Sequence, residues 1–428
     1  MKKTIVTAAL TLFASAALAE GDSVNVELKN ASRTVTYRAA LLVDGKTVTL
    51  SGETLSATEG NEIAALVVNG GKLVLDHCSI NKTGDGISSG QMGGNRPQRP
   101  EGRPEEGQGG PRGGGRPGGG APGGGGDDSF NFYGMNSAVV AVGEGSTIEL
   151  KGCAISTDAE YANAVFSCDE AKVTITDGIT IRTSRGSSRG LFATCAGVIE
   201  ASGTVDISTQ GAHCAALATD RGGGTVIVGT EGCEAKSTLN TAGEGSPCIY
   251  STGDITAHNA TGSAAISQTM VIEGKNTITI TGCDFTGHSP QHGGIMLYQS
   301  FSGDASIGTS TLSMKNSTIR DNSGTAMILV TNTHTIVNME NCTLLDPDGN
   351  ALTTDYPLIT CRNCNTDGHS WGRAGSNGGQ IDVNLTSQKL AGTLLANEEE
   401  SAITLTADQA SDTSALRIAE GAGTVKVN

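Results

Sequence analysis

The side chains best suited to contact a ligand are a sparse set of charged and aromatic residues that recur along the second half of the chain. Asp220 and Arg221 open a Gly-rich turn, while Glu273 and Lys275 lie two residues apart, a spacing that places both on one side of a strand. Each pair is also explained by an ion pair or a turn contact. On stacked layers, however, such residues would form a polar strip able to bind a glycan or an ion. The candidate ligand-binding residues are Asp220, Arg221, Glu273, Lys275, Tyr298, Asp304 and Trp371.

Acid–base chemistry on a glycan is the alternative. Glycoside cleavage needs two carboxylates about 5–9.5 Å apart on either side of one bond. The phrase Asn365-Thr366-Asp367 with His369 is superficially similar to the polygalacturonase pattern, but that pattern adds a paired-Asp phrase and an Arg-x-Lys phrase. The only adjacent aspartates here are Asp127 and Asp128, and no Arg-x-Lys follows. The sequence therefore assigns no catalytic residue.

Cysteine and histidine could instead hold a metal. Cys361 and Cys364 with His369 do not supply four zinc ligands at fixed spacing, and Pro290 prevents a helix from aligning His288 with His292. We therefore expect neither a metal nor a cofactor. Eleven cysteines in an exported chain favour disulfides, with a ladder of buried thiols as the alternative. The candidate pairs are Cys78 with Cys153, Cys168 with Cys195, Cys214 with Cys248, and Cys361 with Cys364.

The elements that must position these residues repeat at intervals of roughly 22–32 residues, a period typical of solenoids. Each repeat has two alternating apolar segments, and the second carries a Cys or Ser slot, as in Leu73 to Ile80 and Ile148 to Ile155. A β-sandwich would not return this slot once per period. The pattern predicts an all-β, right-handed parallel β-helix of roughly ten coils, with coil after coil stacked over residues 63–395. Its expected inward aliphatic and aromatic residues include Leu75, Ile80, Leu150, Ile155, Ile280, Phe285 and Leu344.

Composition divides the chain further. Residues 89–128 are rich in Gly, Pro and Arg and cannot bury enough apolar surface to order themselves, so we expect a disordered insert that leaves one coil and returns to the next. Residues 1–19 have the charged, apolar and small-residue regions of a signal peptide cleaved near Ala19. The expected units are a signal peptide (1–19), an N-terminal capping coil (20–62), a first coil (63–88), the insert (89–128), the β-helix body (129–395) and C-terminal coils (396–428).

Charge and hydropathy exclude several partners. Without residues 1–19, the chain has 26 basic and 44 acidic residues, a net charge of −18 that disfavours nucleic acid and anionic lipid. No later segment approaches the roughly 20 apolar residues of a transmembrane helix. We therefore expect a secreted, periplasmic or cell-surface protein with no nucleic-acid partner and no membrane span.

Five phrases of the sequence stand out: Phe132 to Asn136, Asp220 to Val226, Val271 to Asn276, Met296 to Ala305 and Ser370 to Gly379. They resemble phrases of exported bacterial adhesin-like β-helix proteins, which have a pectin-lyase-like fold and a Gly-rich insert. The resemblance implies the fold and an exported location. We expect a non-enzymatic protein that binds glycans or host and bacterial surface components through a coil face. A polysaccharide lyase or glycoside hydrolase, or a structural spacer, are the alternatives.

Overall fold

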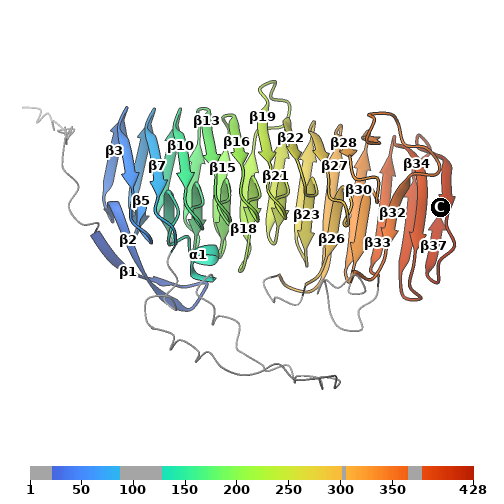
Figure 1. The fold of residues 1–428 in the computed structure, drawn as a ribbon, viewed down its shortest axis with the longest axis horizontal. Helices are drawn as coiled ribbons and strands as arrows, with labels where there is room; N and C mark the ends of the chain where they lie inside the picture. The colour runs from blue at the N-terminus through green and yellow to red at the C-terminus, as the bar shows by residue number, and fades with distance from the viewer. Residues whose placement is uncertain (1–21, 87–127, 301–304, 365–377) are drawn as a thin grey trace, which may run out of the picture.

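The computed structural model describes residues 22–86, 128–300, 305–364 and 378–428, and these form a right-handed parallel β-helix (Figure 1). Three sheets run along the stack, but only two of them reach its C-terminal end, so not every described coil contributes a strand to all three. The C-terminus lies at the far end from the first coils. The predicted fold class is therefore confirmed.

Sheet A has fourteen strands among the described residues, and a short turn links most of them to sheet B. Its strands are β1 (Asp22–Leu28), β2 (Arg33–Asp44), β5 (Ile63–Val68), β8 (Val139–Val142), β11 (Val165–Cys168), β14 (Leu191–Thr194), β17 (Leu217–Thr219), β20 (Ile249–Ser251), β23 (Met270–Glu273), β26 (Ile295–Tyr298), β29 (Ile328–Thr331), β32 (Pro357–Cys361), β34 (Lys389–Ala396) and β36 (Asp412–Ile418).

Sheets B and C have thirteen and ten strands in the same part of the chain. Sheet B contains β3 (Thr47–Ser51), β6 (Lys72–Asp76), β9 (Thr147–Lys151), β12 (Lys172–Ile175), β15 (Gly197–Ala201), β18 (Gly224–Val228), β21 (Asp254–His258), β24 (Thr277–Thr281), β27 (Thr309–Lys315), β30 (His334–Glu340), β33 (Gln380–Thr386), β35 (Ala402–Ala407) and β37 (Thr424–Val427). Sheet C contains β4 (Thr54–Ala57), β7 (Ser79–Thr83), β10 (Ala154–Asp158), β13 (Ile179–Thr183), β16 (Val205–Thr209), β19 (Ser237–Thr241), β22 (Ala260–Ala264), β25 (Asp284–Gly287), β28 (Thr318–Asp321) and β31 (Thr343–Leu345).

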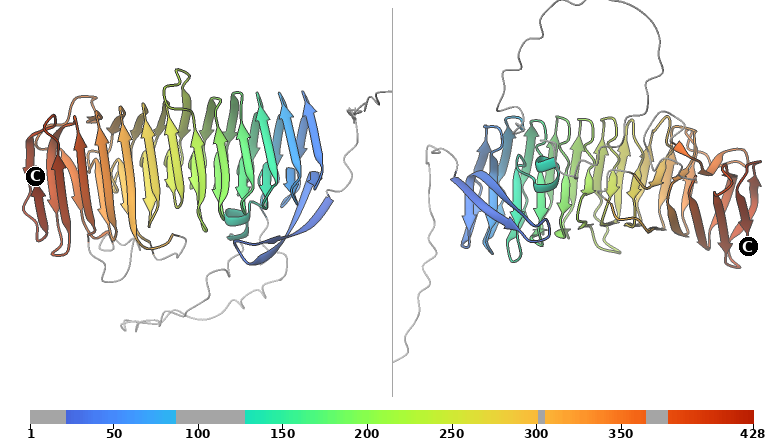
Figure 2. Two further views of the ribbon diagram at one scale, coloured as in Figure 1. Left: turned by 180° about the vertical axis from the view of Figure 1, so that it is seen from behind. Right: turned by 90° about the horizontal axis from the view of Figure 1, so that it is seen from below.

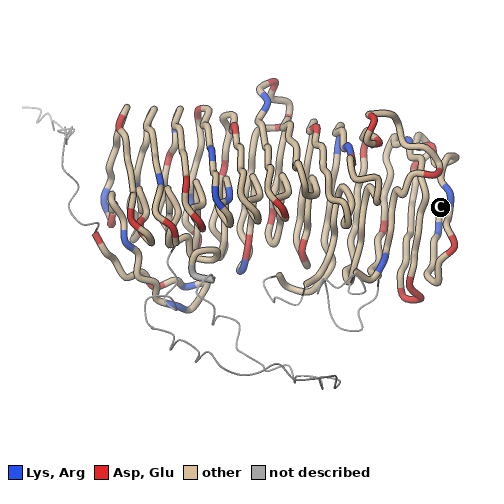
Figure 3. Tube along the Cα trace, viewed as in Figure 1, with Lys and Arg blue, Asp and Glu red and all other residues tan. Residues whose placement is uncertain are grey.

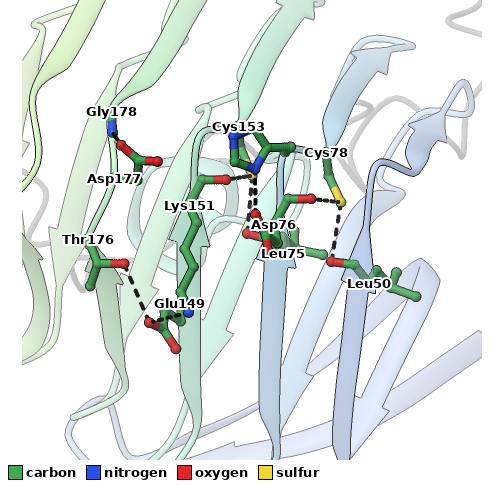
Figure 4. Close-up of polar contacts among 11 residues, drawn as sticks. Leu50, Leu75, Asp76, Cys78, Glu149, Lys151, Cys153, Thr176, Asp177 and Gly178 are labelled. Atoms are coloured by element: carbon green, nitrogen blue, oxygen red, sulfur yellow. Dashed lines mark hydrogen bonds and ion pairs between the residues drawn. The ribbon is translucent and has the colours of Figure 1, made fainter. Parts of the chain in front are cut away.

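The strands stack in the register that the repeated phrases predict. Ile155 pairs with Ile80 on the preceding coil, which places Cys153 directly beside Cys78 in the slot between sheets B and C. Each thiol donates to a carbonyl of the coil before it: Cys153 Sγ to Leu75 O at 3.3 Å, and Cys78 Sγ to Leu50 O at 3.6 Å (Figure 4). The slot thus forms a ladder of small polar groups along the stack.

The core runs through the middle of the solenoid, between the three sheets. Alternation in a strand sends every second side chain inward, so one column of aliphatic residues fills the interior of each sheet. The inward residues predicted from the repeats are all buried, and Leu344 near the end of sheet C is the most exposed of them at 7 %. The described inner core is thus continuous from Val43 to Leu405.

The stack is longer than the roughly ten coils expected from the sequence. Strands β3 and β4 belong to it before residue 63, and β35 to β37 form the C-terminal coils expected over residues 396–428. The outermost strands, β3 and β37, are less buried because one side of each has no neighbouring coil. Strand β3, for example, has no fully buried residue.

The N-terminal segment differs from the expected capping coil. Strands β1 and β2 pair antiparallel, and only the second half of β2 joins the stack, beside β5. The rest of this hairpin, which we call the strap, lies across the outer face of the first coils with helix α1 (Asp128–Tyr133) next to it (Figure 2). A second core, formed by Tyr37, Phe166, Phe192 and their neighbours, fills the space beneath it. Six residues are too few for helical periodicity, so the sequence gives no sign of α1.

The predicted insert lies mostly outside the described residues, but its two flanks are close together. The Asn136 side chain donates to Gly84 O at 3.1 Å and to Glu160 O at 2.9 Å, and it accepts from Asn61 N at 2.8 Å. Gly86 N donates to Glu160 O at 3.1 Å. The chain on either side of the insert is therefore joined through one buried asparagine. The signal peptide predicted over residues 1–19 also lies outside the described residues.

Candidate functional site

The predicted polar strip is partly real, because strand register brings some of its members into one line. On the outer face of sheet A, Glu273 pairs with Tyr298 on the next coil, and Tyr298 pairs with Thr331 on the coil after that. Ala218 pairs with Tyr250, and Tyr250 with Val271, so Asp220 lies in the same line as Glu273, two coils before it.

Glu273 is the centre of a hydrogen-bonded cluster. Its Oε2 accepts from Tyr250 Oη at 2.5 Å and from Tyr298 Oη at 2.9 Å, and its Oε1 accepts from the Ser300 hydroxyl. Burial, with the Glu273 charge adding to it, raises the pKa of Tyr298 well above its ordinary value, and burial does the same for Tyr250. Both phenols therefore remain neutral donors to the carboxylate.

This cluster supports the fold at this point and does not present a binding surface. Glu273 is 2 % exposed and Tyr298 is 4 % exposed, and Tyr298 packs with Val271 and Met296 in a small outer cluster. A ligand therefore has almost no access to either side chain. Their position instead fixes the start of the turn that follows β26, because Ser300 is tied to Glu273.

The remaining strip residues are separated from this cluster. Strand β23 ends at Glu273, and Gly274 adopts a left-handed conformation with φ of +68°, so Lys275 lies exposed in the turn and not on the same strand side. The predicted Glu273–Lys275 ion pair is not among those of the described residues. Arg221 lies over the Phe132 ring, 4.0 Å from its centroid, and so ties α1 to the coils. Asp304 and Trp371 lie outside the described residues.

An open hollow of about 330 Å³ lies directly after the Glu273 cluster in the chain. It is formed by the turns from sheet A to sheet B on two consecutive coils and by the start of β33 on the next. Its floor follows the paired first residues of three strands, Thr309, His334 and Gln380. The lining residues are Gln299, Ile307, Gly308, Thr309, Asn332, Thr333, His334 and Gln380.

Hydrogen bonds fix the polar walls of the hollow. Asn332, whose φ of +54° suits an asparagine, donates from Nδ2 to Gln299 O at 3.0 Å and so joins the two turns. His334 Nε2 lies 2.8 Å from Asp382 Oδ2, and its Nδ1 faces Thr309 Oγ1 at 3.4 Å. The imidazole is therefore held in one orientation by a carboxylate on the next coil.

Two polar atoms of the hollow's residues have no hydrogen-bond partner among the residues that the structure describes. They are Gln299 Oε1 and Thr333 Oγ1, and both atoms are buried. Beside them, Ile307 is 62 % exposed and forms an apolar part of the wall. Among the described residues that line the hollow, none is Lys, Arg, Asp or Glu. The hollow therefore offers amide, hydroxyl and imidazole groups next to one aliphatic surface.

The sequence does not indicate this hollow. Of its lining residues, only Gln299 lies in one of the phrases that carry the family resemblance, and none is among the candidate ligand-binding residues. The polar residues that line the hollow lie in turns, directly after strands that end in register with each other. Such residues are ordinary in turns, so their types alone do not separate a binding wall from a solvated loop.

All eleven cysteines lie in the described part of the chain, and none of them forms a disulfide. Cys78 and Cys153 lie directly opposite each other, as predicted, but their thiols bond to carbonyls instead of to each other. Cys214 stacks on Ser246, whose Oγ accepts from Cys214 N at 2.9 Å, so Cys248 is displaced by two residues. The predicted pairing of Cys214 with Cys248 is therefore wrong in register.

The remaining candidate pairs, Cys361 with Cys364 and Cys168 with Cys195, lie in different parts of the core. Cys361 is in the inner core, and Cys364 follows on the same coil. Cys168 and Cys195 lie on adjacent coils beneath the strap, in the second core. No group of His, Cys, Asp or Glu with the arrangement of a metal site occurs among the described residues.

No helix in the described ranges is long and apolar enough to cross a membrane. Along the coils, Lys and Arg are interspersed with Asp and Glu (Figure 3). Comparison with protein-family models, with curated proteins and with solved structures gives no match to this chain.

Proposed function

We propose that this protein is an exported, adhesin-like, non-enzymatic β-helix that binds a neutral glycan at the hollow between the turns after β26 and β29. The observation that carries the proposal is the lining of the hollow. Donor and acceptor side chains from three consecutive coils converge there around an exposed Ile307, and no lining residue has a carboxylate, ammonium or guanidinium group. A concave site with a few convergent polar groups is the usual form of a small-molecule site.

The donor set suits a sugar ring. A pyranose presents hydroxyl groups around its edge and C–H groups on its faces, so it needs partners that both donate and accept, beside an apolar surface. Gln380, Asn332 and Thr309 supply amide and hydroxyl groups of both kinds. Ile307 supplies the apolar surface.

The unmet hydrogen-bonding capacity at the hollow favours a ligand that brings hydroxyl groups. A buried polar atom without a partner costs about 1–3 kcal/mol. Gln299 and Thr333 each have such an atom, and a small rotation of either side chain toward a bound hydroxyl would recover part of that cost.

Charge supports a neutral ligand over an anionic one. The chain has a formal charge of −16 at pH 7, and none of the residues that line the hollow is Lys or Arg. An acidic glycan would be repelled by this field, whereas a neutral glycan would not. Because each contact is weak, binding to a repetitive surface would depend on several sites or several molecules acting together.

Export follows from the N-terminal sequence, with its charged and apolar regions before Ala19. An exported β-helix with a polar hollow on its side is suited to contact host or bacterial surface components.

A glycan array probed with the protein from residue 20 onward tests the proposal. We expect retention of neutral glycans and weak retention of sulfated or uronic-acid glycans. Each retained glycan is then incubated with the protein, and new reducing ends and unsaturated products are measured. No retention of any glycan would contradict the binding function. Cleavage of a retained glycan would contradict the non-enzymatic assignment.

A further inference from the structure

Cys168 and Cys195 lie on adjacent coils in a relative position that no other two cysteines share. Cys168 ends strand β11, and Thr194 on the next coil is its partner in register. Cys195 follows Thr194, so the two cysteines are neighbours on adjacent coils displaced by one residue. Strands lie about 4.8 Å apart and rise about 3.3 Å per residue, which puts the two Cα atoms about 5.8 Å apart. Disulfides most often join Cα atoms about 5.5–6 Å apart.

The other candidate pairs lack this geometry. Cys214 and Cys248 are displaced by two residues, which puts their Cα atoms about 8 Å apart. This separation exceeds the roughly 7 Å limit for a disulfide. Cys78 and Cys153 have no displacement, and their side chains point the same way toward carbonyls of the preceding coil. One pair in the described chain therefore has the diagonal arrangement.

Backbone conformation turns both side chains to the same face. Cys168 points outward from sheet A with Phe166, into the core beneath the strap. Alternation would send Cys195 inward, but its φ of +49° reverses the chain at the end of β14 and returns its side chain to the outer core. Cys168 is fully buried and Cys195 is 3 % exposed. The two thiols thus share one enclosed, mostly apolar space.

Each thiol also donates to a backbone carbonyl, Cys168 Sγ to Phe132 O at 3.8 Å and Cys195 Sγ to Arg221 O at 3.6 Å. The interaction with Cys168 lowers the pKa of Cys195, while the same interaction together with burial raises the pKa of Cys168. Cys195 is therefore the sulfur that ionises first, and the thiolate is the nucleophile in disulfide exchange.

We propose that Cys168 and Cys195 form a disulfide that joins the coil of β11 to the coil of β14 beneath the strap. During folding, before the strap covers the pair, the Cys195 thiolate attacks one sulfur of a small-molecule or protein disulfide, forming a mixed disulfide and releasing one thiolate. Cys168, after losing its proton to solvent, attacks the Cys195 sulfur of that mixed disulfide and releases the second thiol. The donor disulfide is thereby reduced to two thiols, and the two cysteines are oxidised by two electrons.

The disulfide would stabilise the two coils that the strap packs against. Tyr37 of the strap packs in the same core and donates from Oη to Tyr133 O at 3.0 Å. Asp169, next to Cys168, accepts from Lys29 N at 3.0 Å and from Asn30 N at 2.7 Å at the turn of the strap. A bond between the two coils would therefore hold in place the residues that the strap contacts.

The test refolds the protein from residue 20 onward from urea in a mixture of reduced and oxidised glutathione, then traps free thiols with iodoacetamide. We expect the intact mass to fall by about 2 Da for each bond before trapping. Peptide mapping should find Cys168 linked to Cys195, with the other nine cysteines alkylated. Peptides that show both residues alkylated, or linked to other cysteines, would overturn the proposal.

Melting temperature gives a second measure. Adding dithiothreitol should lower the melting temperature of the oxidised wild type by several degrees and should leave that of a Cys168→Ser/Cys195→Ser variant unchanged. The matched control is Cys78→Ser/Cys153→Ser, which should keep the response to dithiothreitol. A response lost in the control and kept in the first variant would contradict the assignment. If a double variant does not fold, the peptide map of the wild type decides alone.

Discussion

The Tyr298 hydroxyl donates a 2.9 Å hydrogen bond to the Glu273 carboxylate across two adjacent coils of sheet A. Tyr250, one coil before Glu273, donates to the same oxygen. Three coils are therefore joined on their outer face by one buried carboxylate, next to the turn that leads into the hollow.

Substitutions at Tyr298 should affect stability more than ligand contact. Tyr298→Phe removes one hydrogen bond and should lower the free energy of unfolding by about 1 kcal/mol. Tyr298→Ala also removes the buried ring and should cost about 3 kcal/mol. Urea denaturation followed by far-UV circular dichroism measures both. Equal stability of Tyr298→Ala and wild type would mean that the ring is not buried as described.

Lys82 gives the solenoid a pH dependence. It points into the core from β7, where its Nζ donates to Glu59 O and Gly84 O, each at 2.8 Å. Burial lowers the pKa of Lys82 to about 8, from an ordinary value near 10.5. Between pH 8 and 10.5 the unfolded chain therefore binds more protons at Lys82 than the folded chain does, so its contribution to stability rises with pH.

The comparison with Lys82→Met isolates this effect from cysteines and tyrosines that titrate in the same range. The stability of the wild type relative to Lys82→Met should increase from pH 8 to 10.5 and should not change between pH 6 and 7. Exposed Lys72, replaced in the same way, is the matched control and should show a smaller change. A relative stability that falls over pH 8–10.5 would contradict a buried, destabilised ammonium group.

The Gly-rich insert should be dispensable for folding. Asn136 joins its two flanks through Gly84 O and Glu160 O, so the coils on either side do not depend on the insert for their contact. Replacing residues 89–126 with a short Gly-Ser linker should leave a single cooperative thermal transition. Asn136→Ala, which keeps the insert, should instead cost about 2 kcal/mol because it removes the three hydrogen bonds of one buried side chain. A non-cooperative transition in the deletion variant would contradict this independence.

Much of the fold was predictable because the same pattern of buried residues returns once per coil. The aliphatic columns and the Cys/Ser slot return at a fixed place in each repeat, and a parallel stack is the arrangement that buries all of them together. Ile80 and Ile155, aligned from their phrases alone, are register partners in the structure.

The site was less predictable because it depends on backbone geometry between repeats. Lys275 was placed beside Glu273 by strand alternation, but the left-handed Gly274 ends the strand between them. Tyr298 has a chemically versatile side chain, yet register with Glu273 buries it. The hollow arises from turns of different length that stack on one another, and side-chain types alone do not specify how such turns pack.

Binding of a neutral glycan at the hollow is tested by the affinity of a Thr309→Ala/Gln380→Ala variant for a glycan retained on the array. Both side chains are exposed at the floor of the hollow, so the variant should fold as the wild type does. Isothermal titration should show at least about tenfold weaker binding, equivalent to roughly 1.4 kcal/mol. Thr47→Ala, at an equally exposed strand start in sheet B, is the matched control and should bind as the wild type does. Unchanged affinity of the double variant would show that the glycan binds elsewhere on the protein.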